Sequence, residues 1–262
     1  MLFYRRKIYD FFSLVEFGFN FGRIFGILVR VLVIKFYNRS HQEKMEKTEM
    51  EFSHQGEKIT AIYPFFGPAD SKTLLSIIKL EKYSAPAFPE LTSFVHHYFS
   101  GEGKHSEEIT EIMNTKYFVG FTGILYLPQE KEVYFMDHPK FDMASVVDTD
   151  NLISRIRLND FRTRVSLDGI ETGTLPWNKI AKNPFFIAVS GGEEGAEKLA
   201  ELASKHQTKN GHIFVPKISN FMSPQARIPL LYSYDRGRSL TVSLNGSGST
   251  TNSYAFGLIK NQ

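Results

Sequence analysis

The chain has 262 residues, enough for one large domain or two modest ones, and a net charge of +3 that is unevenly distributed. Residues 1–39 contain seven Lys or Arg against two acidic residues, a net charge of +5, which leaves −2 for the rest. A nearly neutral body excludes a protein built mainly to grip a nucleic-acid backbone, so we expect no nucleic-acid partner. The chain has no cysteine, which excludes disulfides and thiolate metal ligands.

The first 37 residues are apolar and rich in phenylalanine, and two residue types recur along them at helical spacings. The glycines are Gly18, Gly22 and Gly26, and the charged residues are Glu16, Arg23 and Arg30. Spacings of four and seven return side chains to one face of an α-helix, which predicts a single amphipathic, transmembrane-like helix. Glycines at every fourth position let two such helices pack closely in a bilayer, and the charges could pair across that contact.

The same segment is compatible with three placements. It could span the membrane, or it could lie flat in the head-group region with its polar stripe toward water. It could also be a targeting segment or a helix buried in a soluble core. The first two placements, across the membrane or flat on it, predict a membrane-associated protein, with membrane lipid and a second copy of the chain as partners.

The first 37 residues are followed by a charged segment and then by a body in which strands and helices are both predicted. Residues 38–58 are charged, mixed in sign and poor in aliphatics, which predicts a solvated stalk between the anchor, residues 1–37, and a globular body, residues 59–262. The body begins with a strand over 59–66. Two amphipathic helices follow, one capped at Asp70 or Ser71 and one beginning near Pro89. Residues 107–113 are expected to form a third, short helix.

From residue 117 the apolar pattern favours strands. Paired strands are predicted at 117–127 and 132–136, then a short helix at 148–158 capped by the run Asp148 to Asn151. Asp168-Gly169 is a preferred hairpin turn, which predicts that 161–167 pairs with 170–175.

The last third of the chain contains the pattern that decides the predicted fold class. A continuous apolar run at 185–190, a helix to about residue 206 and a strand at 212–215 predict one βαβ unit. Antiparallel strands are expected at 228–234 and 239–244, followed by a last strand at 254–259. The predicted class is therefore α+β, with a mixed sheet.

The best candidate ligand loop is Ser190-Gly191-Gly192, at the predicted strand-to-helix junction. Glycines let backbone N–H groups approach a phosphate, and a helix N-terminus favours negative charge. The loop resembles the SGGxDS loop of the ATP-pyrophosphatase (PP-loop) family, with Glu194 and Gly195 where the family has Asp and Ser. This resemblance implies a phosphate-binding loop at Ser190, Gly191 and Gly192. The alternative is a glycine turn into a helix that begins with acidic residues.

The other candidate functional residues have spacings that do not favour a binding site. The adjacent His96 and His97 point about 100° apart on a helix, so no metal site is predicted, although His105 lies nearby in sequence. The single tryptophan, Trp177, is interpreted as a core anchor. The four arginines at 155, 157, 162 and 164 could form an anionic contact surface, but a solvated strand face explains them more simply.

These patterns lead to two functional hypotheses. The first is a membrane-associated, non-enzymatic binding or assembly protein that self-associates through its glycine-striped helix. The second is an enzyme or sensor that binds a nucleotide or phosphate at the Ser190–Gly192 loop. No motif identifies a catalytic residue, a cofactor or a particular small-molecule ligand.

Overall fold

The computed structural model describes residues 46–99, 105–168, 170–171, 173–205, 209–214, 222–234 and 239–259. The helices of these ranges are α3 Ser71–Leu80, α4 Phe88–Phe99, α5 Ser106–Thr115, α6 Thr149–Arg157, α7 Trp177–Ile180, α8 Pro184–Val189 and α9 Glu193–Ser204. The strands are β1 Thr48–His54, β2 Glu57–Ala69, β3 Tyr117–Val119, β4 Thr122–Leu127, β5 Glu132–Asp137, β6 Thr163–Ser166, β7 Gly173–Pro176, β8 Asn210–Phe214, β9 Gln225–Tyr234, β10 Ser239–Gly246 and β11 Ser253–Ile259.

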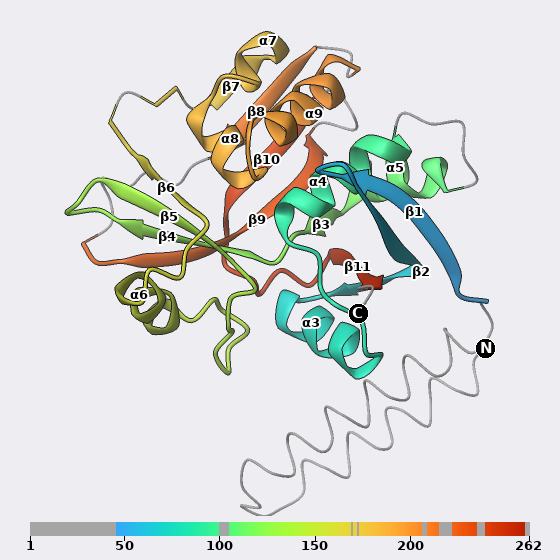
Figure 1. Cartoon of the computed structure of the whole chain (residues 1–262), viewed down its shortest axis with the longest axis horizontal. Helices are drawn as coiled ribbons and strands as arrows, with labels where there is room; N and C mark the ends of the chain where they lie inside the picture. Colours follow the sequence, from blue (N-terminus) through green and yellow to red (C-terminus); the bar gives the residue numbers. More distant parts are fainter. Residues whose placement is uncertain are drawn as a thin grey trace, which may run out of the picture. The chain divides into compact units, whose positions relative to one another are not determined.

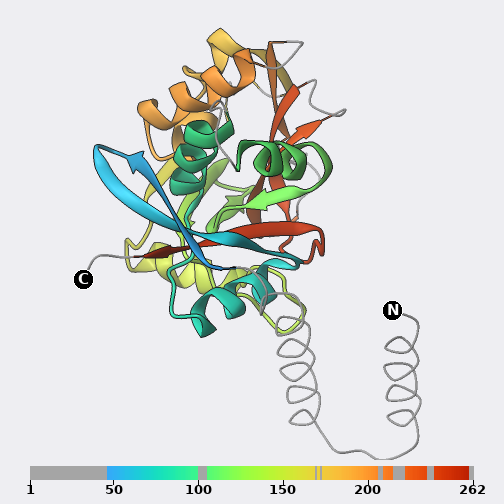
Figure 2. The ribbon, with the colours of Figure 1, turned by 90° about the vertical axis from the view of Figure 1, so that its right-hand side faces the viewer.

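The body, which begins at Lys47, is a mixed α/β domain built on one branched sheet of eleven strands in its described residues. The main path runs β1-β2-β11-β3-β9-β10-β8-β7, and a branch leaves β9 through β4 and β5 to β6. The pairs β11–β3 and β10–β8 are parallel, and the others are antiparallel. In both views the helices α7 to α9 lie near β8 at one end of the body, and α3 and α6 lie at the other (Figure 1, Figure 2).

An aromatic cluster forms the centre of the core between α4 and the strands β1, β2 and β11. Phe94 on α4 is fully buried, and its ring centroid lies 5.4 Å from that of Phe52, 5.8 Å from that of Phe65 and 4.3 Å from that of Phe256. Phe52 and Phe65 come from the first two strands of the body and Phe256 from the last, so this contact joins both ends of the body. Burying each ring removes a large apolar area from water and supplies much of the stability.

The predicted fold class is wrong, because the segment expected to open a βαβ unit is helical. Pro184–Val189 forms α8: the Asn183 side chain accepts hydrogen bonds from the amides of Phe185 and Phe186, and Pro184 occupies the first turn. An Asn cap followed by proline starts a helix, and this local signal outweighs the strand-like apolar run. The strand expected at 212–215 does form, as β8, but its parallel partner is β10, and the other parallel pair is β11 with β3.

The prediction of a transmembrane helix also finds no support. In the part of the chain that the structure describes, no helix is both long and apolar enough to cross a membrane. The predicted helix over residues 11–37, with all of its glycine and charged positions, lies outside the described residues. Within the segment expected to be a stalk, residues 48–58 form β1 and the start of β2 instead, and Met50 and Phe52 are buried.

The predicted hairpin at Asp168 does not form. β6 pairs with β5, and β7 pairs with β8, so the two segments that flank the turn join different parts of the sheet. A preferred turn dipeptide biases the chain locally, whereas the available strand edges decide the partner.

Candidate ligand-binding site

A cavity of about 580 Å³ lies between α3 and the loop that follows β5. We call it the basic pocket. Its lining residues are Lys72, Leu75, Ser76, Lys79, Tyr83, Ser84, Ala85, His138, Pro139, Lys140 and Phe141. Three lysines and a histidine contribute to the wall, and no carboxylate does. The volume falls in the range of sites for small organic ligands.

The amphipathic character of α3 places two of the lysines. Asp70 caps the helix by accepting hydrogen bonds from the Thr73 amide at 3.0 Å and from its hydroxyl at 2.8 Å. Leu74, Ile77 and Ile78 are buried against the body. Lys72, Ser76 and Lys79 recur at the spacing of the outer helical face, which lines the pocket.

The opposite wall is a loop that its own backbone contacts hold in place. The Asp142 carboxylate accepts hydrogen bonds from the amides of Ala144 at 2.8 Å and Val146 at 2.9 Å. Phe141 pairs with Val147 in an isolated bridge, and its ring packs edge-on against Phe121 with centroids 6.5 Å apart. This loop therefore presents Lys140 and Phe141 to the pocket from an ordered backbone.

One hydrogen bond links the two walls of the pocket, and an ion pair beside it neutralises a carboxylate. Lys72 Nζ donates to the Asp142 carbonyl at 2.5 Å, which links α3 to the loop. The Glu81 carboxylate accepts a 2.7 Å hydrogen bond from Lys47, and this bond raises the pKa of Lys47. Lys47 also lies 5.3 Å from the centroid of the Tyr83 ring, behind the pocket wall. The pocket is thus suited to an anionic group, with the rings of Tyr83 and Phe141 available for a flat or apolar portion of the ligand.

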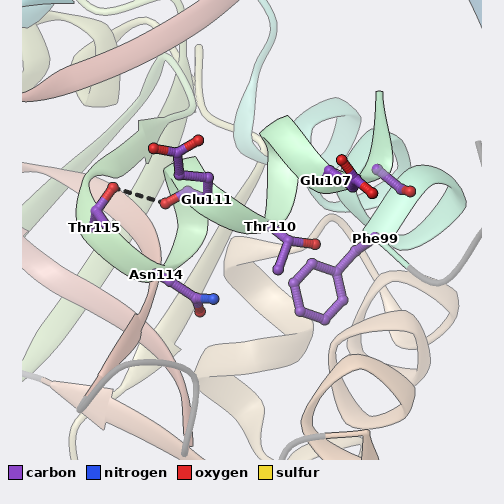
Figure 3. A pocket seen from close by; sticks show the side chains of 7 residues that line it. Phe99, Glu107, Thr110, Glu111, Asn114 and Thr115 are labelled. Atoms are coloured by element: carbon purple, nitrogen blue, oxygen red, sulfur yellow. Dashed lines mark hydrogen bonds between the residues drawn. The ribbon is translucent and has the colours of Figure 1, made fainter. Parts of the chain in front are cut away.

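A second hollow, of about 490 Å³, runs along one face of α5 (Figure 3). Its lining residues are Phe99, Ser106, Glu107, Thr110, Glu111, Asn114 and Thr115. The Thr115 hydroxyl donates to the Glu111 carbonyl at 2.7 Å. Six of the seven lining residues belong to a single helix, and the two carboxylates are not brought together with groups from another element. We assign no ligand to this surface.

The Ser190–Gly192 loop connects two helices, α8 and α9, and not a strand to a helix. The Ser190 hydroxyl donates back to the Phe186 carbonyl, and Gly191, at φ +84°, packs against Pro89 so closely that an added Cβ would lie 2.8 Å from the proline ring. The following turn carries Glu193 and Glu194. The close approach to Pro89 explains why residue 191 is a glycine. Phosphate binding at this loop stays a prediction.

The remaining sequence candidates are dispersed. His96 contacts Glu201 at 2.6 Å, whereas the His105 ring packs on Tyr63. In the described ranges no group of three His, Cys, Asp or Glu side chains could hold a metal ion. The prediction of a helix cap at Asp148 is confirmed, since its carboxylate accepts from the Asn151 amide at 2.9 Å. The interpretation of Trp177 as a core anchor is wrong, because the residue is 46% exposed.

The four arginines do not form one surface. Arg155 pairs with Asp160 at 2.6 Å, and Arg164 lies 3.5 Å from Glu132. Arg162 is largely buried and donates to the carbonyls of α8, and this burial lowers its pKa.

Sequence reasoning missed the residues of the basic pocket. The sequence did contain a signal for the wall formed by α3, since Lys72, Ser76 and Lys79 have helical spacing opposite an apolar stripe. No sequence signal places Lys140 and Phe141 opposite that face, because the two walls are about 60 residues apart and meet only through the tertiary fold.

Comparison with known proteins identifies a fold and no family. No family model matches the chain, and no curated protein does. A solved structure described as "Accommodation of massive sequence variation in Nanoarchaeota by the C-type lectin fold" is similar, with a TM-score of 0.51 and 16% sequence identity. The match covers 81% of this chain and 97% of that one. The body resembles a C-type lectin fold. At this identity the likeness concerns the fold alone.

A buried polar cluster joins the end of β1 to α4 and α9. His54 Nδ1 lies 2.9 Å from Ser93 Oγ, and Lys198 Nζ donates to the same oxygen at 3.0 Å and to Glu194 at 2.6 Å. The Ser93 hydroxyl therefore has two polar partners, the Lys198 ammonium and the His54 ring. Burial lowers the pKa of His54, and the charge of Lys198 lowers it further.

We expect this cluster to make stability depend on pH. The charges around His54 are Lys198 and Arg162, which lower its pKa, and Glu194 and Glu57, which raise it. The folded pKa lies below the ordinary value of about 6.5, so the unfolded state binds more protons and stability falls as pH drops below that value. His54→Asn keeps a hydrogen-bonding side chain beside Ser93 but removes the titrating group, so it should reduce this loss, measured by urea unfolding at neutral and mildly acidic pH. An unchanged pH dependence in the variant would contradict the assignment.

Proposed function

We propose that this protein is a non-enzymatic binding protein that takes an anionic small molecule into the basic pocket. The observation that carries the proposal is the charge of the wall, with three lysines and a histidine around one cavity and no carboxylate among its lining residues. A carboxylate, phosphate or sulfate group would lie within reach of ammonium groups from both walls. The aromatic rings would contact the rest of the ligand.

Two further features of the proposal come from the amino-acid sequence. The basic and apolar character of the first 37 residues supports association with membrane lipid, and the repeat of Gly18, Gly22 and Gly26 supports self-association. Both concern residues outside the described ranges and stay predictions. The fold likeness is compatible with a binding function but carries no ligand with it.

Binding of inorganic pyrophosphate to the full-length chain, measured by isothermal titration calorimetry, tests the pocket. Lys79 and Lys140 are both exposed, so their attraction to an anion is screened to about 1 kcal/mol each, or roughly fivefold in affinity. Lys79→Gln combined with Lys140→Gln should therefore weaken binding by about 25-fold.

The matched control is Lys182→Gln combined with Lys209→Gln. These lysines are also exposed and lie near α7 and β8, and the substitutions change the net charge by the same amount. The control should bind as the unmodified chain does. Equal weakening in both double variants would show a general charge effect and would overturn the proposal.

A further inference from the structure

Two exposed apolar side chains belong to the segments that form the basic pocket. Leu80 is 59% exposed and lies one helical turn beyond Ser76 on the outer side of α3, and Met143 is 76% exposed, two residues after Phe141. In the described part of the chain only three other large apolar side chains are comparably exposed: Leu158, Trp177 and Met222. Exposing leucine and methionine to water has a free-energy cost, and here both side chains belong to segments that also carry lysines of the pocket.

The charge of this face is predominantly positive: three lysines line the pocket, and the exposed Asp142 carboxylate accepts hydrogen bonds from the amides of Ala144 and Val146. Lys79 and Lys140 are exposed beside Leu80 and Met143, respectively, and the nearby Glu81 is paired with Lys47. We call the outer side of α3 together with residues 138–143 the pocket face. Cationic side chains interspersed with protruding apolar ones are complementary to a membrane surface, where head groups carry negative charge and the acyl region accepts apolar groups.

The start of the body lies beside this face. Lys47, where the body begins, donates to Glu81 and lies 5.3 Å from the centroid of the Tyr83 ring, and a basic, apolar segment precedes it in the sequence. That segment includes residues 1–39, which are apolar and carry a net charge of +5. The composition of that segment is complementary to anionic lipid head groups.

We propose that the pocket face docks on an anionic membrane, with the phosphate of a lipid head group as the anion in the basic pocket. This inference rests on the anion binding proposed above and names its source. Lys72, Lys79 and Lys140 contact the phosphate, and Leu80 and Met143 enter the interfacial region. Docking on a membrane, unlike binding of a free anion, places positions 80 and 143 in the interfacial region.

A single-site fluorescent label tests the docking on the full-length chain. Because the protein contains no cysteine, Met143→Cys gives one attachment point for a polarity-sensitive dye, and Met222→Cys gives a matched label at an exposed methionine elsewhere. Each labelled chain is mixed with vesicles of phosphatidylcholine, with and without phosphatidylserine. We expect a blue shift of the dye at position 143 with phosphatidylserine only and no shift at position 222.

Two further measurements separate the possible results. Lys79→Gln with Lys140→Gln should raise the concentration of phosphatidylserine vesicles that gives half of the shift by about 25-fold, since each basic residue near an anionic surface contributes about fivefold in affinity. Inorganic pyrophosphate should compete with the vesicles. Absence of the shift at position 143 while pyrophosphate still binds would overturn the docking and leave the anion site standing. Absence of both would overturn both, and equal shifts at 143 and 222 would exclude this face as the docking surface.

Discussion

Replacing Phe94 with alanine is expected to lower the free energy of unfolding by about 3–5 kcal/mol. The ring is fully buried and packs on Phe52, Phe65 and Phe256, which belong to three different strands. These rings are held by the sheet and cannot move together to fill the space, so the substitution leaves a cavity in addition to the lost apolar burial. Urea unfolding followed by circular dichroism measures the change.

The control for this substitution is Trp177→Ala. Trp177 is larger than phenylalanine but 46% exposed, so its removal should cost clearly less than that of Phe94. A comparable loss at both positions would mean that aromatic burial in the cluster is not what stabilises the body.

Gly120→Ala is expected to destabilise the body by about 3 kcal/mol, although it adds a single methyl group. A Cβ at this position would lie 2.5 Å from Phe88 Cα and 2.8 Å from Phe88 N, so the clash is with backbone at the start of α4. The neighbouring backbone is tied down, since the Phe121 amide donates to the Pro86 carbonyl at 2.8 Å. Relief of the clash would require separating the chain after Val119 from the helix.

Gly123→Ala is the matched comparison on the next strand, β4. There an added Cβ would meet Pro139 Cβ at 2.9 Å and the methyl groups of Leu152 at 3.1 and 3.2 Å. Side-chain atoms can shift more easily than backbone, so we expect a smaller loss of thermal stability. If the Gly120 variant melts at the higher temperature of the two, the close approach to Phe88 is not a constraint on this fold.

Local patterns predicted several elements well. The helix α3 begins where Asp70 was expected to cap it, and α4 begins beside Pro89 with Leu91, Phe94 and Val95 inward. The antiparallel pairing of β9 with β10 is confirmed as well. In each case the signal and the structure it specifies lie within about 15 residues, so a single cap, turn or apolar stripe is sufficient.

Predictions failed where an apolar run has two local solutions. Phe185 to Val189 are apolar throughout, which suits a buried strand or a short buried helix, and periodicity does not distinguish them. The Asn183-Pro184 pair was the signal that should have decided for the helix. The strand interpretation led directly to the wrong βαβ unit and fold class.

The amino-acid sequence by itself determined where most helices of the body begin, which faces they bury and how charge divides between the first 39 residues and the rest. Hydrogen-bonded caps and helical periodicity act over a few residues, so they can be recognised without knowing which other segments pack against the helix. Only the tertiary structure decided that β6 and β7 join different strands, and that Lys72 and Lys79 on α3 meet Lys140 and Phe141 around one cavity. Those juxtapositions depend on which sheet edges and helix faces remain free after the core has packed, and that is a property of the whole chain.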